Sequence, residues 1–115
     1  MVEYKRSERV GDQIRMEMAD IFLNKVKDPR IGFVTVVSVE MSDDLRNAKI
    51  FVSVLGGDPA TSFKGLEKAK AFIRGELGRR LKLRFVPELI FHEDRSAERV
   101  DKIYQLMKEI KEPHT

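Results

Sequence analysis

The chain has 115 residues, of which 42% are hydrophobic and none is cysteine. This length fits one compact domain with a single core, and the absence of thiols excludes disulfide scaffolds, thiolate metal sites and cysteine nucleophiles. The amino terminus is charged from its third residue, and no run approaches the roughly 18 apolar residues of a membrane span. We therefore expect a soluble cytoplasmic protein.

The first predicted element is a long helix from about Ser7 to Lys27. Asp28-Pro29 ends it, because proline disfavours helical geometry in the residue before it. Its apolar residues recur at three- and four-residue spacing, and they are Val10, Ile14, Met18, Ile21, Phe22 and Val26.

Two strands are predicted next. A β-branched run extends from Val34 to Met41, and a second run extends from Lys49 to Leu55. Ser42-Asp43-Asp44 and Asn47, which lie between the runs, are residue types that favour turns. We expect an antiparallel hairpin with a loop of five or six residues, in which the two aspartates shape the turn and have no acid-base role.

Gly56-Gly57-Asp58-Pro59 breaks the second strand, and helical spacing resumes from Phe63 to Leu81. Glycine costs about 1 kcal/mol relative to alanine inside a helix, so small residues here predict a bend or two shorter helices instead of one straight rod. These small residues are Ala69, Ala71, Gly75 and Gly78.

A short strand near Glu88 to His92 and a last helix, capped by Asp94 or Ser96, complete the order. The apolar face of that helix consists of Val100, Ile103, Tyr104, Met107 and Ile110. Helix, strand, strand, helix pair, strand and helix together predict an α+β fold in which a three-stranded sheet is covered on one face.

Positive charge is concentrated in residues 63–84, which carry a net charge of +6 in a chain whose total is +3. Such a field attracts a polyanion, and the other interpretation is a solvated helix surface with incidental cations. We predict phosphate contacts that weaken as salt rises, made by Lys68, Lys70, Arg74, Arg79, Arg80, Lys82 and Arg84. Arg30 is either a further RNA contact or the partner of Asp28 in a structural turn.

Other residue types give no sign of a reaction centre. His92 and His114 lack the spacing of metal ligands, so we predict no metal, no cofactor and no catalytic residue. The phenylalanines follow the apolar pattern, so most are predicted to pack in the core and no platform for stacking bases is expected. They are Phe33, Phe51, Phe63, Phe72, Phe85 and Phe91.

Short motifs along most of the chain resemble the ribosome-binding factor A family, whose members are bacterial factors for small-subunit assembly. Each motif is weak alone, but their order and spacing are specific. They are Arg6, Arg9-Val10, Asp28-Pro29-Arg30, Val34-Thr35-Val36, Ser42-Asp43-Asp44-Leu45, Ala48-Lys49-Ile50, Val52-Ser53, Ile73-Arg74, Leu77, Leu83-Arg84, Pro87-Glu88-Leu89, Phe91, Asp94 and Ser96.

The resemblance implies a type II KH-like fold in which a helix-kink-helix carrying Ala-x-Gly replaces the usual Gly-x-x-Gly phosphate loop. Ala69-Lys70-Ala71 stands at the kink, with alanine at the third position. Alanine resists the strained backbone angles that glycine accepts, so we expect a shallower kink or ordinary helical angles. Residues 1–115 would then form a single RNA-binding domain with a short flexible tail from about residue 112.

The resemblance also implies a function. It predicts a monomer without enzymatic activity that binds the free 30S subunit and 16S rRNA and assists late 30S maturation and 16S 5′-end processing, with an assembly GTPase as a further candidate partner. Two alternatives remain open. One is a KH-like regulator of another structured RNA, and the other is a small phosphate-handling α+β enzyme that uses Arg30 or a helix N-terminus, although no activated nucleophile or base supports it.

Overall fold

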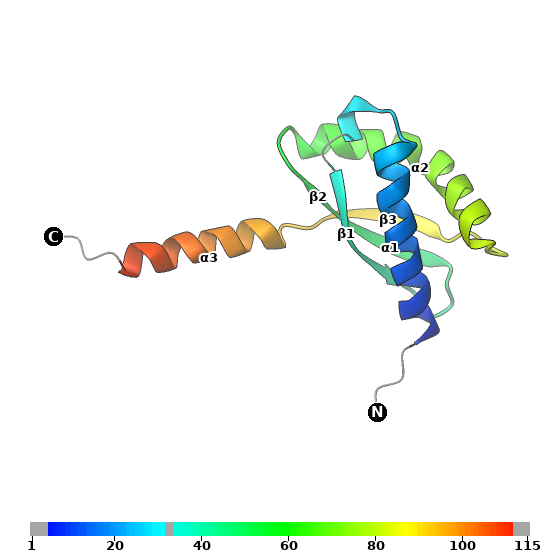
Figure 1. The fold of residues 1–115 in the computed structure, drawn as a ribbon, viewed down its shortest axis with the longest axis horizontal. Helices are drawn as coiled ribbons and strands as arrows, with labels where there is room; N and C mark the ends of the chain where they lie inside the picture. Colours follow the sequence, from blue (N-terminus) through cyan, green and yellow to red (C-terminus); the bar gives the residue numbers. More distant parts are fainter. Residues whose placement is uncertain (1–4, 32–33, 112–115) are drawn as a thin grey trace.

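Three helices and a three-stranded sheet make up the computed structural model, which describes residues 5–31 and 34–111, without the side chains of 97–101 and 109–111. The residues assigned to a flexible tail lie outside this description. In chain order the elements are α1 (Arg6–Asn24), the 3-10 turn η1 (Pro29–Ile31), β1 (Val34–Met41), β2 (Asn47–Val54), α2 (Pro59–Leu81), β3 (Glu88–Glu93) and α3 (Ser96–Lys111). Figure 1 shows their arrangement.

The sheet has the strand order β1-β2-β3. β1 and β2 pair antiparallel, as the hairpin prediction required, while β3 pairs parallel to β2. Parallel neighbours need a crossover connection, which α2 provides. In the hairpin loop the Asp44 carboxylate accepts hydrogen bonds from the Ser42 hydroxyl at 2.6 Å and the Arg46 N–H at 3.0 Å, so its predicted turn role is confirmed.

One hydrophobic core lies between the sheet and the helices α1 and α2, which also contact each other. The apolar positions predicted from helical spacing supply it: Ile14, Met18 and Ile21 from α1 are fully buried, and so are Ile73 and Leu77 from α2. α1 approaches β1 closely at Gly11, where an added Cβ would lie 3.1 Å from the Val39 carbonyl oxygen. These contacts fix the orientation of α2, which carries most of the predicted cations.

Of the two predicted forms, a bend or two shorter helices, the structure shows the bend, because α2 is one continuous helix of 23 residues that is not straight. Its first turn is capped by Asp58, whose side chain accepts a hydrogen bond from the Ala60 N–H, and Figure 1 shows that the helix changes direction along its length. Ala69-Lys70-Ala71 keeps helical geometry. The helix ends at Leu81, and the next residue, Lys82, adopts the left-handed conformation with φ of 51°.

The last helix departs from the expected packing. Asp94 accepts a hydrogen bond from the Ser96 N–H at 2.8 Å next to the start of α3, consistent with the predicted cap, but α3 extends away from the sheet (Figure 1). Ile103, Tyr104 and Met107 of its apolar face remain 57%, 69% and 50% exposed. Amphipathic spacing predicts an apolar face, but it does not determine what covers that face. None of the described helices has the length and hydropathy needed to cross a bilayer.

Candidate nucleic-acid interface

The cations predicted to bind RNA fall into two structural groups. Some point outward from α2, and others are held by carboxylates or carbonyl oxygens of the same chain. This distinction matters because a guanidinium that already has good acceptors is less available to a phosphate than an exposed one.

Arg74 holds the segment that connects α2 to β3. Its Nε donates to the Pro87 carbonyl oxygen at 3.0 Å, and a terminal nitrogen donates to that of Val86 at 2.9 Å. Glu88 lies 3.6 Å from the same guanidinium. The role of Arg74 seen here is to fix this connecting segment, and no local sequence pattern indicates such a bond to a distant backbone.

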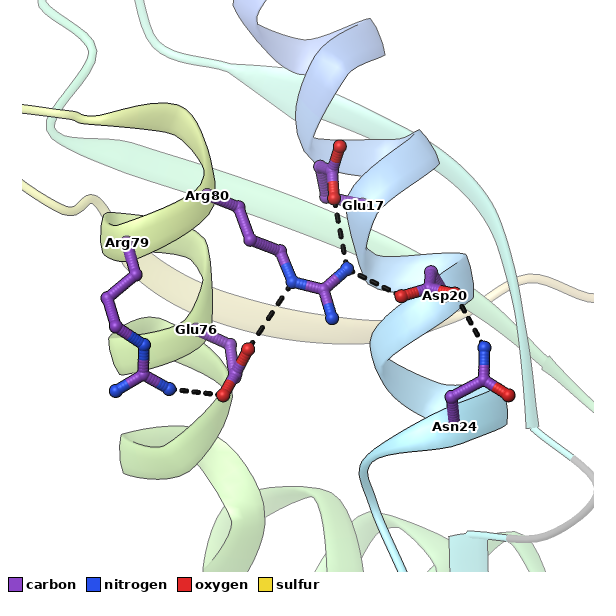
Figure 2. Close-up of polar contacts among 6 residues, drawn as sticks. All are labelled: Glu17, Asp20, Asn24, Glu76, Arg79 and Arg80. Carbon is purple, nitrogen blue, oxygen red and sulfur yellow. Dashed lines mark hydrogen bonds and ion pairs between the residues drawn. The ribbon is translucent and has the colours of Figure 1, made fainter.

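Arg80 joins the two helices that flank the core. Its guanidinium donates hydrogen bonds to Glu17 and Asp20 of α1 at 3.0 and 2.6 Å, and its Nε donates to Glu76 of α2 at 3.3 Å. Figure 2 shows the guanidinium between these acidic side chains of the two helices. The hydrogen bonds that Arg80 donates to the carboxylates of Asp20 and Glu17 raise the pKa of Arg80. Arg79 also contacts Glu76 but keeps 69% of its side chain exposed. Arg80 thus connects α1 to α2.

Replacing Arg80 with alanine is expected to lower Tm by several degrees, because Glu17 and Asp20 would lose their shared cation and Glu76 would keep only Arg79. Thermal unfolding monitored by circular dichroism at neutral pH measures the effect. A second variant that adds Asp20→Asn removes one of the three charges and should recover part of the loss. Equal melting temperatures for wild type and Arg80→Ala would contradict the proposed helix tie.

Arg30 forms a bidentate pair with Asp28 across η1. Its Nε lies 3.0 Å from Oδ1, and its terminal nitrogen lies 2.6 Å from Oδ2. Of the two interpretations of Arg30, the structure shows the ion pair in place, and an RNA contact by this side chain stays a prediction. The hydrogen bonds from the Arg30 side chain and backbone lower the pKa of Asp28 from 3.8 to about 2.

This pair predicts a dependence of stability on pH. Because the folded pKa of Asp28 lies below its unfolded value, its stabilising contribution is complete above about pH 4 and disappears as pH falls toward 2. Asp28→Asn should therefore lower Tm at neutral pH and should lose less Tm than wild type between pH 4 and pH 2. Parallel melting curves for the two proteins over that range would show that the pair does not stabilise the fold.

A row of exposed positions runs along α2 on the side away from the core, and we call it the outer stripe. Its spacing of three and four residues places the members from Lys64 to Arg79 on one helix face, and Lys82 follows directly after the helix. The members are Lys64, Lys68, Ala71, Gly75, Arg79 and Lys82, all of them exposed. Within the described ranges neither Lys68 nor Lys82 forms an ion pair, although the charge of Lys68 contributes to lowering the pKa of Asp28. Lys70, by contrast, pairs with Glu67 at 2.8 Å and lies over the Phe91 ring.

Gly75 lies in the middle of the outer stripe, where the helix backbone is not covered by a side chain. A Cβ at this position would meet no atom within 4 Å, so packing inside the protein does not require glycine here. Glycine nevertheless destabilises a helix interior. Glycine is used elsewhere where another backbone must approach closely, which makes the stripe suited to a nucleic-acid backbone. Gly75 was predicted only to favour a bend. Lys64 was not among the predicted contacts, although its four-residue spacing from Lys68 is visible in the sequence.

Comparison with known proteins adds independent information. The family model for ribosome-binding factor A matches residues 6–107. The chain belongs to the ribosome-binding factor A family. A family member from Syntrophobacter fumaroxidans is 47% identical over 113 residues, which cover 95% of this chain and 97% of the relative.

Solved structures confirm the fold of this family member. The crystal structure of ribosome-binding factor A from Thermus thermophilus matches with a TM-score of 0.71 at 23% identity, covering 78% of this chain and 98% of that one. A model of the Thermus thermophilus protein fitted into a cryo-EM map of a complex between the 30S subunit and ribosome-binding factor A matches with a TM-score of 0.68 at 23% identity, covering 80% and 98%. The predicted KH-like α+β fold is thus confirmed.

Proposed function

We propose that this protein is a cytoplasmic, monomeric assembly factor that binds the free 30S subunit and its 16S rRNA and assists late 30S maturation, including 16S 5′-end processing, without catalysing a reaction. Membership of the ribosome-binding factor A family supports the ribosomal target. The Thermus relative fitted into a 30S complex supports the free small subunit as the partner.

The observation that carries the proposal is the outer stripe of α2. Lys68, Arg79 and Lys82 present exposed charge to phosphates, with Gly75 between them. Arg84 extends this positive surface beyond the helix end. The remaining predicted contacts have partners within the protein and contribute to the positive field around the stripe, and they are Arg30, Lys70, Arg74 and Arg80.

The proposed mechanism depends on how phosphate contacts can change the conformation of the bound rRNA. Phosphate contacts supply affinity and position, and carry little base sequence information. A bound protein shifts an equilibrium between two rRNA conformers only by its difference in affinity for them. We propose that the stripe fits the backbone geometry of the conformer accepted by the processing machinery, and that the protein increases the population of that conformer.

Sedimentation of the tagged protein through sucrose gradients of cell lysate tests the proposal. At low salt we expect the protein on free 30S subunits and absent from 70S ribosomes. At moderate salt we expect partial release, because binding frees counterions from the RNA and this release is less favourable when more salt is already in solution. A protein at the top of the gradient at both salt concentrations would contradict the proposal, and association with an unrelated RNA would favour the regulator interpretation.

Gly75→Ala is expected to raise the stability of the fold and to weaken binding to the 30S subunit. Alanine removes the cost of a helical glycine, so the free energy of unfolding should rise by about 0.5–1 kcal/mol. The added methyl group should also hinder close approach of the rRNA backbone and reduce 30S association. Urea unfolding and sedimentation measure the two effects, with Gly78→Ala as a control in which an added Cβ lies 2.9 Å from a Val86 methyl carbon and should give no such gain in stability. Unchanged association of Gly75→Ala would argue against close approach at this position.

A further inference from the structure

A groove of about 640 Å³ opens at one end of the molecule, outside the outer stripe. It lies between the first turn of α1, the β1–β2 loop and the segment that joins α2 to β3, three parts that Figure 1 places at the same end of the fold. Its walls include Val10, Met41 and Leu45 together with Phe85. The groove is therefore apolar at its base and large enough for a planar ring system.

Phe85 is the aromatic residue that lines this groove, and 75% of its surface is accessible. Most phenylalanines were predicted to pack in the core, but Phe85 remains in solvent and Phe72 is 46% exposed. The guanidinium carbon of Arg84 lies 5.5 Å from the ring centroid. An aromatic ring that keeps an open face next to a cation matches the combination by which proteins stack unpaired bases.

The segment that carries Phe85 is held in place by hydrogen bonds from α2. Arg74 of α2 donates hydrogen bonds to the carbonyl oxygens of Val86 and Pro87, and Pro87 is fully buried. The residues directly after Phe85 are thus anchored while its ring remains in solvent. Because a pre-positioned contact loses little conformational freedom on binding, this anchoring favours ligand binding by Phe85. It also gives Arg74 a function that does not require direct RNA contact.

The charges around the groove favour an anionic chain. Arg6, Arg46 and Arg84 line it and are exposed. Of the two lining carboxylates, Glu88 lies near the Arg74 guanidinium, and Asp44 accepts hydrogen bonds from the Ser42 hydroxyl and the Arg46 backbone N–H. Three arginines against two carboxylates leave the lining with a net positive charge. Three exposed guanidinium groups therefore surround an exposed aromatic ring, and guanidinium groups bind phosphate in a bidentate manner.

A second aromatic site on the open face of the sheet is a weaker candidate. There Phe51 and His92 stack with ring centroids 5.4 Å apart. The adjoining hollow is lined by Glu40, Glu93 and Asp94 with a single arginine, Arg95. The excess of carboxylates would repel phosphates flanking a base, so the groove at Phe85 is the better match for RNA.

We infer that the groove receives one unstacked base of single-stranded RNA. The base stacks on Phe85, and Arg6, Arg46 and Arg84 contact the phosphates on either side of it. This inference rests on the proposed function, because it assigns a second contact with the same rRNA: the outer stripe binds backbone without regard to pairing, and the groove requires an unpaired nucleotide. The protein would then recognise a site where a paired region meets a splayed base.

Fluorescence anisotropy with a short labelled RNA tests the groove directly, using the full chain and the same RNA either single-stranded or annealed to its complement. Phe85→Ala should weaken single-stranded binding by about 5- to 100-fold, as loss of a stacked base predicts, and should leave duplex binding unchanged. Phe85→Trp, which retains a stacking surface, should keep most of the affinity. Leu23→Ala removes another exposed apolar side chain, 82% accessible on α1, and should have no effect. Arg46→Gln should reduce the dependence of log affinity on log salt by about 1.

Three results would overturn the inference. One is full single-stranded affinity in Phe85→Ala, another is equal weakening of single-stranded and duplex binding, and a third is full affinity in Phe85→Leu, which would show a simple apolar contact. Binding of a short polyglutamate peptide that depends on Phe85, without any effect on RNA, would assign the groove to an acidic protein segment instead. Sedimentation of wild type with 30S subunits reports separately on the proposed function. If wild type did not sediment with 30S subunits, the ribosomal target would be wrong. That result would not bear on the groove, which the Phe85 variants test with single-stranded RNA.

Discussion

Replacing both Lys68 and Lys82 with glutamate is expected to release the protein from free 30S subunits. Each substitution removes a cation from the outer stripe and places an anion beside RNA phosphates. We expect at least about a tenfold loss of affinity and a salt dependence of log affinity that is smaller by about 2. Quantitative sedimentation with purified 30S subunits over a range of salt concentrations measures both quantities.

The matched control is Lys102→Glu with Lys108→Glu on α3. These two lysines are also exposed, so the control has the same change in net charge at a different place. We expect it to lower affinity only slightly, through the field of the whole protein. Equal losses in the two double variants would mean that net charge determines binding and that the stripe is not the contact surface. Arg74 and Arg80 are unsuitable for such a test, because their reversal would break contacts inside the protein.

Ile73→Ala is expected to cause a large loss of stability. Ile73 is fully buried in the core, and truncation of a buried isoleucine costs about 2–5 kcal/mol through lost apolar burial and the cavity that remains. Domains of this kind have about 5–15 kcal/mol of stability in total, so the variant should be partly unfolded at moderate urea. Urea titration followed by circular dichroism gives the change in the free energy of unfolding.

Ile103→Ala provides the control for the same chemical change at an exposed site. Ile103 lies on α3 with 57% of its surface accessible, and we expect a change within about 0.5 kcal/mol. A comparable loss in both variants would show that α3 packs against the domain in solution, in conflict with its extended position in Figure 1.

Arginines of α2 that are exposed for binding and arginines that hold the fold together cannot be told apart in the sequence. Arg79 and Arg80 are neighbours in α2, yet the first lies on the exposed stripe and the second connects two helices (Figure 2). The reason is the turn of about 100° per residue along a helix, which rotates one side chain outward and the next toward α1. Cation density in a segment therefore predicts a polyanion partner, but it does not separate the residues that bind from those that hold the fold.

The element order and the core were determined by local sequence signals. Apolar spacing identified Ile14, Met18 and Ile21 as the inner face of α1, and turn residues marked the hairpin between β1 and β2. These predictions succeeded because a helix or hairpin places residues close in sequence in a periodic way on one face. Asp58-Pro59 likewise marked the break before α2, where Asp58 caps the helix.

Tertiary structure alone decided which charges and rings are available to a partner. Arg80 meets Glu17 across 63 residues of sequence, and Arg74 meets the carbonyl of Val86 across 12. Phe85 and Phe91 both follow the apolar pattern, but Phe91 is buried under the helices and Phe85 remains in solvent. Exposure and pairing depend on elements that come together only when the chain folds, so no periodicity within one segment could have assigned them.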